Sequence, residues 1–315
     1  MNAEQVVPVM VDNYVRAETA RMFDGTVESA GGSNLFVHNR VPTPIDKQNV
    51  IRMNRDTLYS QGIFDISQGG TVTLPEADDR YMSVMVINED HYINRVFSEP
   101  GSYDLDVDQF DTGFVAVYMR MFVDPNDPAD VASVNDIQDQ LTVETATSRP
   151  YTHTQYSEED RERLFKASAQ MAPHDARGMF GAKDEVDPIR HLIGTTIGWG
   201  GLPEYEAFYF GDTTPRPEGE FTFTFEDVPV DGFWSLTIYN REGFMEPNPY
   251  DAYSINNVTA EAEPDGSVVV NLAPEANGRR NHLYIMEGWN YILRLYRPRP
   301  SVLNGSWVPN TPQPA

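Results

Sequence analysis

Short alternating runs of hydrophobic and polar residues dominate the first half of the chain. TVTL (71–74), RYMSVMVIN (80–88) and GFVAVYMRMFV (113–123) are rich in β-branched and aromatic residues, which favour strands. The PEADD run between the first two is typical of a turn, so we expect 71–74 and 80–88 to form a hairpin. VDPNDPADV then ends the third strand, and VNDIQDQL (134–141) predicts a short helix.

The second half of the chain shows the same period of two. EFTFTFEDV (220–228) places Phe221, Phe223 and Phe225 on one face of a strand. Three further strands are expected between turns rich in Gly, Pro and Asn: GFWSLTIYN (232–240), GSVVVNLAP (266–274) and WNYILRLYRP (289–298). Because these strands follow one another without alternating helices, the pattern favours a β-sandwich or jelly roll over a βαβ fold.

Helical spacing occurs at the N-terminus and near the middle of the chain. Residues 3–23 place hydrophobic side chains on one stripe, namely Val7, Met10, Val11 and Tyr14. Gly25 to Pro44 is expected to be a loop. SEEDRERLFKASAQMA (157–172) is the clearest helix, with Ser157 as its cap and Asp160 in the capping-box position.

These patterns predict a mainly β (α+β) protein with two β-sandwich or jelly-roll-like domains. Residues 1–150 are expected to form an N-terminal β-rich domain, 151–200 a helical connector, and 201–315 the C-terminal domain. A chain of 315 residues exceeds the size at which single hydrophobic cores stop growing, which also favours two domains.

The charge of the chain changes the picture of its partners. Asp and Glu total 48 against 23 Lys and Arg, giving a net charge of −25, which disfavours nucleic acid and anionic lipid as partners. Two readings of the acidity stay open: attraction of a cationic ligand, and a solubilising surface adapted to salt. The acids are spread along the chain, which favours the second reading.

Cysteine is absent from the chain, which excludes disulfides, thiolate nucleophiles and Cys-ligated metal sites. No run of 18 apolar residues is present, so we expect no membrane partner. The N-terminal stretch does not have the pattern of a signal peptide, and we expect a cytoplasmic location unless a leader has been removed. The oligomeric state stays open, a homo-oligomer included.

A compact polar motif, RMNRDTLYS (52–60), follows a loop-like run. Arg55 offers a planar, permanently charged fork that suits a substrate carboxylate. Tyr59 could donate a proton, and Asn54 and Asp56 could bind a ligand. The alternative is that Arg55 and Asp56 brace the turn, with Asn54 as a turn-forming residue.

Two further segments carry candidate chemistry. His91 follows a strand and lies beside Glu89 and Asp90, which is the setting of a general base. The segment HLIGTTIGWGGLPEYEAFYF contributes His191 and Trp199 as binding residues and Glu204 as a base or ligand. The alternatives are an ordinary strand end and a tight packing segment. His153 carries little signal in its loop-like context.

The familiar catalytic signatures are absent: the chain has no GxSxG, HExxH, GxxxxGK[ST] or GxGxxG-plus-helix pattern. The spacing of Glu89, Asp90 and His91 matches no metal-ligand motif, so no metal is expected. The cofactor is unknown.

Longer motifs resemble a known family. RMNRDTLYS, RYMSVMVINEDHY and DPADV…QDQL are similar to the domain of unknown function 1254. GFWSLTIYNREGFMEPNPYDAYSINN and WNYILRLYRPRP are similar to its usual companion, the domain of unknown function 1214. The resemblance implies two β-rich domains, the second jelly-roll-like, with helices between them, and no agreed reaction. Many members carry Asn-Trp-Leu-Pro before the last strand, where this chain has Asn281 to Tyr284.

Two hypotheses of function follow from these residues. In the first, an enzyme of the hydrolase or lyase type acts on a small anionic organic molecule in a pocket between the domains. Its catalytic residues would be Arg55, Tyr59, His91 and Glu204, and its binding residues Asn54, Asp56, His191 and Trp199. In the second, the chain is a non-catalytic binding or assembly protein whose polar motifs are internally paired. Whether the chain is an enzyme is left open at this stage.

Overall fold

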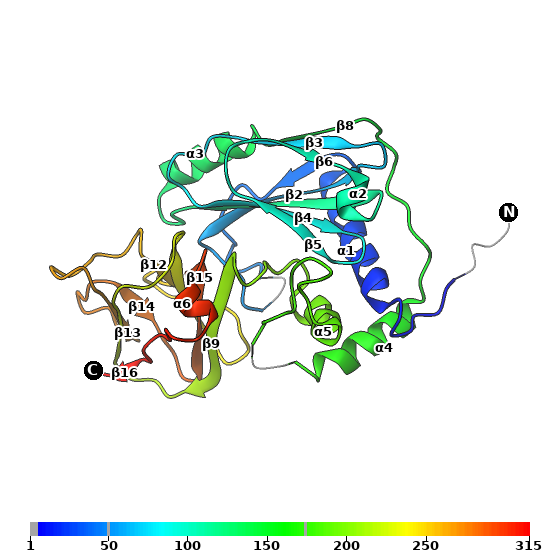
Figure 1. Ribbon diagram of the computed structural model, residues 1–315. Helices are drawn as coiled ribbons and strands as arrows, with labels where there is room; N and C mark the ends of the chain where they lie inside the picture. The colour runs from blue at the N-terminus through cyan, green and yellow to red at the C-terminus, as the bar shows by residue number, and fades with distance from the viewer. Residues whose placement is uncertain (1–5, 49–50, 173–174) are drawn as a thin grey trace. The chain divides into compact units, whose positions relative to one another are not determined.

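A computed structural model describes residues 6–48, 51–172 and 175–315 (Figure 1). The chain divides into two compact units, each built from three stretches of sequence. Unit 1 contains Met1–Arg40, Leu58–Phe122 and Ala132–Glu204. Unit 2 contains Val41–Thr57, Val123–Val131 and Tyr205–Ala315. This division differs from the contiguous ranges 1–150, 151–200 and 201–315 that the sequence predicts.

The described residues form 16 strands and six helices, which confirms a mainly β, α+β fold. The helices are α1 (Tyr14–Ala30), α2 (Val107–Phe110), α3 (Pro128–Gln138), α4 (Glu158–Ala169), α5 (Pro188–Gly198) and α6 (Pro300–Leu303). Among the described residues, no helix is both long and apolar enough to cross a membrane.

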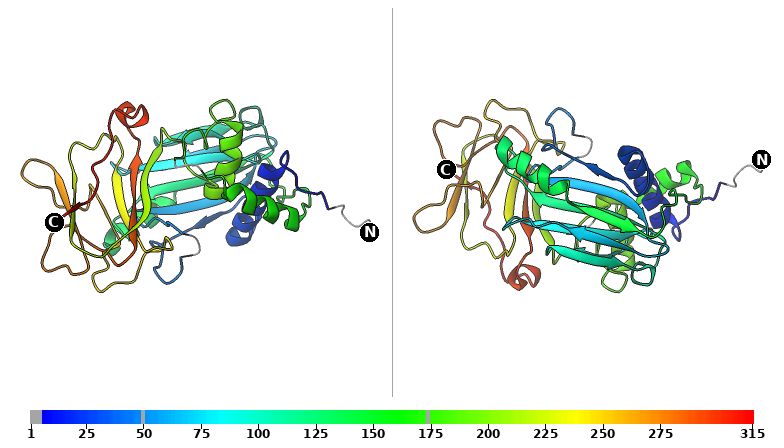
Figure 2. Two further views of the ribbon diagram at one scale, coloured as in Figure 1. Left: turned by 90° about the horizontal axis from the view of Figure 1, so that it is seen from below. Right: turned by 90° about the horizontal axis from the view of Figure 1, so that it is seen from above.

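Unit 1 is built on a five-stranded sheet with the order β1-β2-β7-β4-β5. Its strands are β1 (Phe36–His38), β2 (Thr57–Asp65), β4 (Met82–Asn88), β5 (Ile93–Phe97) and β7 (Phe114–Phe122). A three-stranded sheet has the order β6-β3-β8, from β3 (Gly70–Leu74), β6 (Gly101–Leu105) and β8 (Thr142–Thr145). All seven residues of β4 are buried, as expected for a central strand covered on both faces. Figure 2 shows the strands of the larger sheet running side by side.

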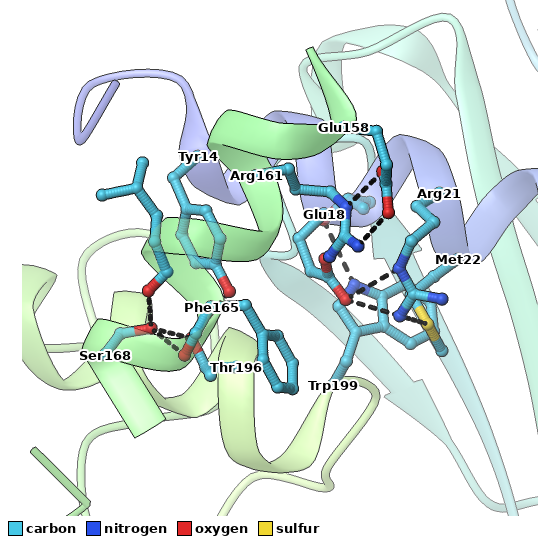
Figure 3. Close-up of polar contacts among 12 residues, drawn as sticks. Tyr14, Glu18, Arg21, Met22, Glu158, Arg161, Phe165, Ser168, Thr196 and Trp199 are labelled. Carbon is cyan, nitrogen blue, oxygen red and sulfur yellow. Dashed lines mark hydrogen bonds and ion pairs between the residues drawn. The ribbon is translucent and has the colours of Figure 1, made fainter. Parts of the chain in front are cut away.

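Helices α1, α4 and α5 pack against one another within unit 1. Arg161 of α4 is buried and bonds to Glu18 of α1 and to Glu158 one turn earlier (Figure 3). Arg21 donates a second bond, of 2.6 Å, to Glu18. Nearby, Thr196 of α5 shares hydrogen bonds of 2.9 Å with Tyr14 and 2.7 Å with Ser168. The three helices are therefore joined by polar contacts as well as by apolar packing.

Unit 2 contains two four-stranded sheets. One has the order β14-β13-β10-β16, from β10 (Phe221–Phe225), β13 (Val268–Ala273), β14 (His282–Tyr284) and β16 (Gln313–Pro314). The other has the order β12-β11-β15-β9, from β9 (Ala207–Arg216), β11 (Trp234–Tyr239), β12 (Ser254–Asn256) and β15 (Trp289–Tyr296). One apolar core draws on both sheets. Phe223 and Phe225 are buried in it, and Phe221 packs against it, as their period of two predicts.

Several expected elements are confirmed at close to their predicted bounds. Ser157 caps α4, and its Oγ accepts a hydrogen bond from the backbone N–H of Asp160 at 3.3 Å. The strands expected at 113–123, 232–240 and 289–298 are β7, β11 and β15. The helix expected at 134–141 begins earlier, at Pro128, because proline suits the first turn of a helix.

The expected hairpin of 71–74 with 80–88 is wrong. β3 pairs with β6 and β8, whereas β4 pairs with β5 and β7. The PEADD connection carries the chain from one sheet to the other. A turn-like composition between two strands does not make them partners, because pairing is decided by which apolar faces can be buried together.

The expected N-terminal helix and the loop after it are also misplaced. α1 runs from Tyr14 to Ala30 and is capped by Gly31, whose φ of 78° gives the left-handed conformation that glycine favours. Residues 3–5 of the expected helix lie outside the described residues. Val7 instead forms a β-bridge with Tyr156, because Pro8 disfavours a helical conformation in the residue before it.

Candidate functional site

The polar motif lies against the outer face of the β12-β11-β15-β9 sheet of unit 2. Asp56 is fully buried there. Its carboxylate accepts hydrogen bonds of 2.5 to 3.2 Å from three neutral donors: the Oγ atoms of Ser235 and Ser254 and Nδ2 of Asn256. On β11 the neighbours of Ser235, Trp234 and Leu236, point into the apolar core instead. Asp56 therefore fastens the segment 41–57 to the polar face of the sheet.

Asn54 is held in the same way. Its Oδ1 accepts a hydrogen bond from the backbone N–H of Asp56 at 2.8 Å. Its Nδ2 donates to Thr57 Oγ1 at 3.1 Å and to the hydroxyl of Tyr296 at 2.8 Å. Both residues thus have internal partners, and their assignment as ligand-binding residues stays a prediction.

Three arginines surround the cluster formed by Tyr239, Met245 and Tyr253, and we call Arg52, Arg55 and Arg294 the arginine face. Arg294 is 5% exposed and donates to the oxygens of Thr237, Tyr239 and the Arg52 carbonyl. The guanidinium carbon of Arg52 lies 5.4 Å from the centre of the Tyr239 ring. That of Arg55 lies 5.3 Å from the centre of the Tyr253 ring.

The arginine face has no acid to neutralise it at contact distance. Arg52 donates to Asn290 Oδ1 at 2.9 Å and Arg55 to the carbonyl of Thr43 at 2.5 Å. Within the described ranges, neither of them nor Arg294 forms an ion pair with a carboxylate. Burial lowers the pKa of the Arg55 guanidinium, which nevertheless keeps its charge. Three positive charges are therefore held by neutral partners and tyrosine rings.

His91 lies in a stack of four rings in unit 1. Its ring centre is 5.3 Å from that of Trp199 on one side and 5.3 Å from that of His191 on the other, and His191 stacks on Tyr92 at 4.6 Å. His91 is fully buried, and its Nε2 accepts the backbone N–H of Gly200 at 2.9 Å. Its Nδ1 therefore carries the proton and donates to Thr195 Oγ1 at 2.8 Å.

Burial also decides the protonation of both histidines. It holds the pKa of His91 well below the ordinary value, and the neighbouring His191 acts in the same direction. Burial lowers the pKa of His191 as well, although the carbonyls of Asp90 and Met179, each 3.1 Å from a ring nitrogen, oppose the shift. With both nitrogens of His91 already bonded, a catalytic role for this ring stays a prediction.

The remaining predicted residues lie elsewhere in unit 1. The Tyr59 ring lies under the guanidinium of Arg120 at 5.5 Å, and Glu204 is exposed. The structure thus brings Asn54, Arg55 and Asp56 together in unit 2, and His91, His191 and Trp199 together in unit 1. A pocket that joins the two groups stays a prediction.

A hollow of about 450 Å³ lies within unit 1, and we call it the Glu89 hollow. Its lining comes from α1, from the turn after β4 and from the stretch before α4: Arg16, Glu89, Thr152, His153, Thr154 and Tyr156. The volume is in the range of small-molecule sites. In the sequence, Glu89 stands out only as a neighbour of His91, and His153 carries little signal.

Two internal ion pairs edge the Glu89 hollow. Arg16 holds Asp90 through two bonds of 2.7 Å, from Nε and from Nη2. The Nε2 of His153 lies 2.8 Å from Asp24 Oδ2, and its Nδ1 lies 2.7 Å from the carbonyl oxygen of Thr154.

Glu89 is left with the weakest pairing of the three acids. Its side chain is 14% exposed, and its Oε1 lies 3.4 Å from Nη1 of Arg16. Burial raises the pKa of the Glu89 carboxyl above its ordinary value, and Arg16 only partly opposes this. A carboxyl of this kind in a hollow can move a proton or balance a positive charge.

Metal ligation has little support in the geometry. Among the residues that the structure describes, no three His, Asp or Glu side chains come together in a group that could hold a metal ion.

Comparisons with known proteins give the family and the fold but no activity. Along its whole length the chain resembles the crystal structure of the VPA0106 protein from Vibrio parahaemolyticus, with a TM-score of 0.74, 19% identity and 96% of each chain covered. It also resembles an uncharacterised protein from Burkholderia cenocepacia, with a TM-score of 0.54 and 15% identity over 91% of this chain and 84% of that one. At these identities the likeness shows the fold alone. No curated protein matches the chain.

Two family models match, both described as proteins of unknown function. One covers residues 33–104 and the other 212–300. The chain therefore carries a DUF1254 region followed by a DUF1214 region, as its motifs predicted.

Proposed function

We propose that the chain is an enzyme of the hydrolase or lyase type that acts on a small anionic organic molecule held by the arginine face. The observation that carries this proposal is the set of three guanidinium groups without a carboxylate partner. Arginine cannot release its proton in a protein, so a buried or half-buried guanidinium needs acceptors.

A ligand carboxylate or phosphate would supply those acceptors. Guanidinium groups bind such anions through paired N–H donors. The rings of Tyr239 and Tyr253 hold Arg52 and Arg55 through their faces, which leaves the edges of the guanidinium planes for an anion. Arg294, which is buried, adds positive charge without needing to touch the ligand.

The proton in such a reaction would come from Tyr59, His91 or Glu204, as the sequence predicts. Because His91 is enclosed, the proposal favours Tyr59 and Glu204 as the source of the proton. Tyr59 is partly exposed and Glu204 is exposed, so both can be reached by a substrate in solution.

A non-catalytic binding protein is the second candidate. The observation that favours it is the enclosed ring stack: His91 and His191 are both buried, and each of their ring nitrogens lies within 3.1 Å of a protein hydrogen-bonding atom. An anion site without an accessible base would bind its ligand and leave it unchanged.

Titration calorimetry with benzoate tests the anion site. Arg55→Ala is expected to weaken benzoate binding at least about tenfold, because a charge-assisted contact of more than about 1.4 kcal/mol is lost. Arg299→Ala removes the same charge from an exposed pair with Asp231 and is expected to bind benzoate as the wild type does. Equal affinity in all three proteins would overturn the proposal.

Turnover separates the enzyme from the binding protein. Small carboxylates that also carry an ester or a β-hydroxyl group would be incubated with the protein and followed by NMR. Product that forms with the wild type and not with Arg55→Ala supports the enzyme. Binding without product across the panel supports the second candidate.

A further inference from the structure

The charges around the Glu89 hollow do not balance. Asp90 takes the two-pronged bond of Arg16, and Asp24 takes the bond of His153. The first of these pairs neutralises itself. Glu89 shares the already engaged Arg16 through a single longer contact of 3.4 Å. One carboxyl in the lining of the hollow is therefore without a positive charge of its own.

We propose that the Glu89 hollow is a binding site for a small organic cation, a protonated amine, with Glu89 as its counter-ion. This site lies within unit 1 and is independent of the arginine face. It needs no assumption about the reaction proposed above.

The lining suits an ammonium group on a short organic body. Tyr156 and His153 present stacked rings, with centres 6.3 Å apart, and the face of a tyrosine ring attracts cations. Thr152 and Thr154 are exposed hydroxyl-bearing residues of the lining that can accept further N–H donors. The volume of about 450 Å³ fits a molecule of modest size.

The charge of the whole chain acts in the same direction. A net charge of −25 raises the local concentration of cations around the protein. An anion is disfavoured here, because Glu89 lines the hollow and two further acids, Asp90 and Asp24, contact lining residues, whereas the lining holds one arginine, Arg16. A bare metal ion is disfavoured because the described side chains offer no ligand group of three or more acids and histidines.

Three probes of one shape and different charge test the site: benzylamine, benzyl alcohol and benzoate, each titrated calorimetrically. Benzylamine is expected to bind the wild type, and Glu89→Gln is expected to weaken this binding at least about tenfold. Glu144→Gln removes the same charge from an exposed position on β8 and is expected to change nothing. Benzyl alcohol is expected to bind weakly or not at all.

The dependence on pH gives a second readout that needs no variant. An amine pairs with the ionised form of Glu89, so benzylamine affinity should fall as the pH is lowered through the pKa of this carboxyl, which burial raises above its ordinary value. The charged and titratable groups that face Glu89 are Arg16, Asp90, His153, Tyr151 and Arg149. Protonation of the acids among them acts in the same direction.

The outcomes separate this site from the arginine face. Loss of benzylamine binding in Glu89→Gln, with the binding retained in Glu144→Gln, supports the inference. Benzylamine affinity that is unchanged in Glu89→Gln overturns it. So does failure of both benzylamine and propylamine to bind the wild type at millimolar concentration. If Arg55→Ala loses benzoate binding and still binds benzylamine as the wild type does, the two ligands bind at separate sites.

Discussion

Helix α1 contributes residues to two sets of acids and arginines. Both sets are built from the same residue types, but only the second has more acids than arginines. In the closed set, Glu18 is enclosed and receives Arg161 and Arg21 (Figure 3). In the open set, Arg16 meets Asp90 and Glu89 at the edge of a hollow. The first set has two arginines and two acids, Glu18 and Glu158, and the second has one arginine for two acids.

The difference shows how to separate a structural ion pair from a candidate site. A closed set satisfies its charges internally, and removing one partner leaves an uncompensated buried charge. An open set keeps an unsatisfied group next to accessible volume, so a ligand can complete it. Counting the charges that remain after internal pairing is therefore more informative than counting charged residues.

The largest expected effect is on the closed set. Arg161→Ala should lower the free energy of unfolding by about 3 kcal/mol, because Glu18 loses a partner while 2% exposed. Arg21 stays bonded to Glu18 and keeps the loss at the lower end of the range for such pairs. Denaturant titration followed by circular dichroism measures the change.

Arg163→Ala is the matched control for this prediction. Arg163 lies on the same helix and pairs with Asp160 at the surface, with 64% of its side chain exposed. Exposed pairs contribute little, so its unfolding curve should stay close to that of the wild type. Equal losses in the two variants would mean that the closed set is not special.

A smaller effect, with the opposite sign, is expected for the open set. The folded chain holds the proton of Glu89 at pH values where the unfolded chain has released it, because burial raises the pKa from 4.5. Ionisation of Glu89 therefore subtracts stability as the pH rises through and above this value. Glu89→Gln should gain in melting temperature relative to the wild type between about pH 4 and about pH 7.

Glu144→Gln serves again as the comparison for this measurement. Its melting temperature should follow that of the wild type across the same interval, because residue 144 is exposed. A Glu89→Gln variant with no gain in melting temperature over the wild type in this interval would show that Arg16 compensates Glu89 fully, and the distinction between the two sets would fail.

The smallest effect on the two sets is expected from salt. With a net charge of −25, the surface repels itself, and the melting temperature of the wild type should rise between about 0.05 and about 1 M NaCl. The difference between the wild type and Arg161→Ala should stay constant, because buried pairs are screened little. A flat wild-type curve would mean that local pairing already compensates the surface acids.

The strands could be predicted from the sequence because alternate residues of a strand point to the same face, so a buried face gives a hydrophobic pattern with a period of two. Phe221, Phe223 and Phe225 illustrate this on β10. The pairing of the strands was not readable, since β3 and β4 are neighbours in sequence and belong to different sheets. Register and partner choice depend on tertiary packing, which local composition does not encode.

The candidate sites were readable only in part. Arg55 was found because a permanently charged side chain in a polar turn needs a partner, and the structure gives it a carbonyl and a tyrosine ring. His153 was missed because its partner, Asp24, is far away in the chain. Glu89 is close to His91 in the sequence region that was singled out, but in the structure it lines a hollow with Arg16, whereas His91 is enclosed in a ring stack. Such groupings arise from folding and leave no local motif.

The fastening of segment 41–57 also sets an order of events during synthesis. Asp56 can accept its hydrogen bonds from Ser235 and Asn256 only after a further 179 and 200 residues have been made. Asn54 can donate to Tyr296 only after a further 242 residues have been made. The Asp56 carboxylate therefore stays exposed in a nascent chain until the residues of β11 and β12 have left the ribosome. Unit 2 is therefore completed late in translation, although part of it is made early, and contacts of such long range are slow to form.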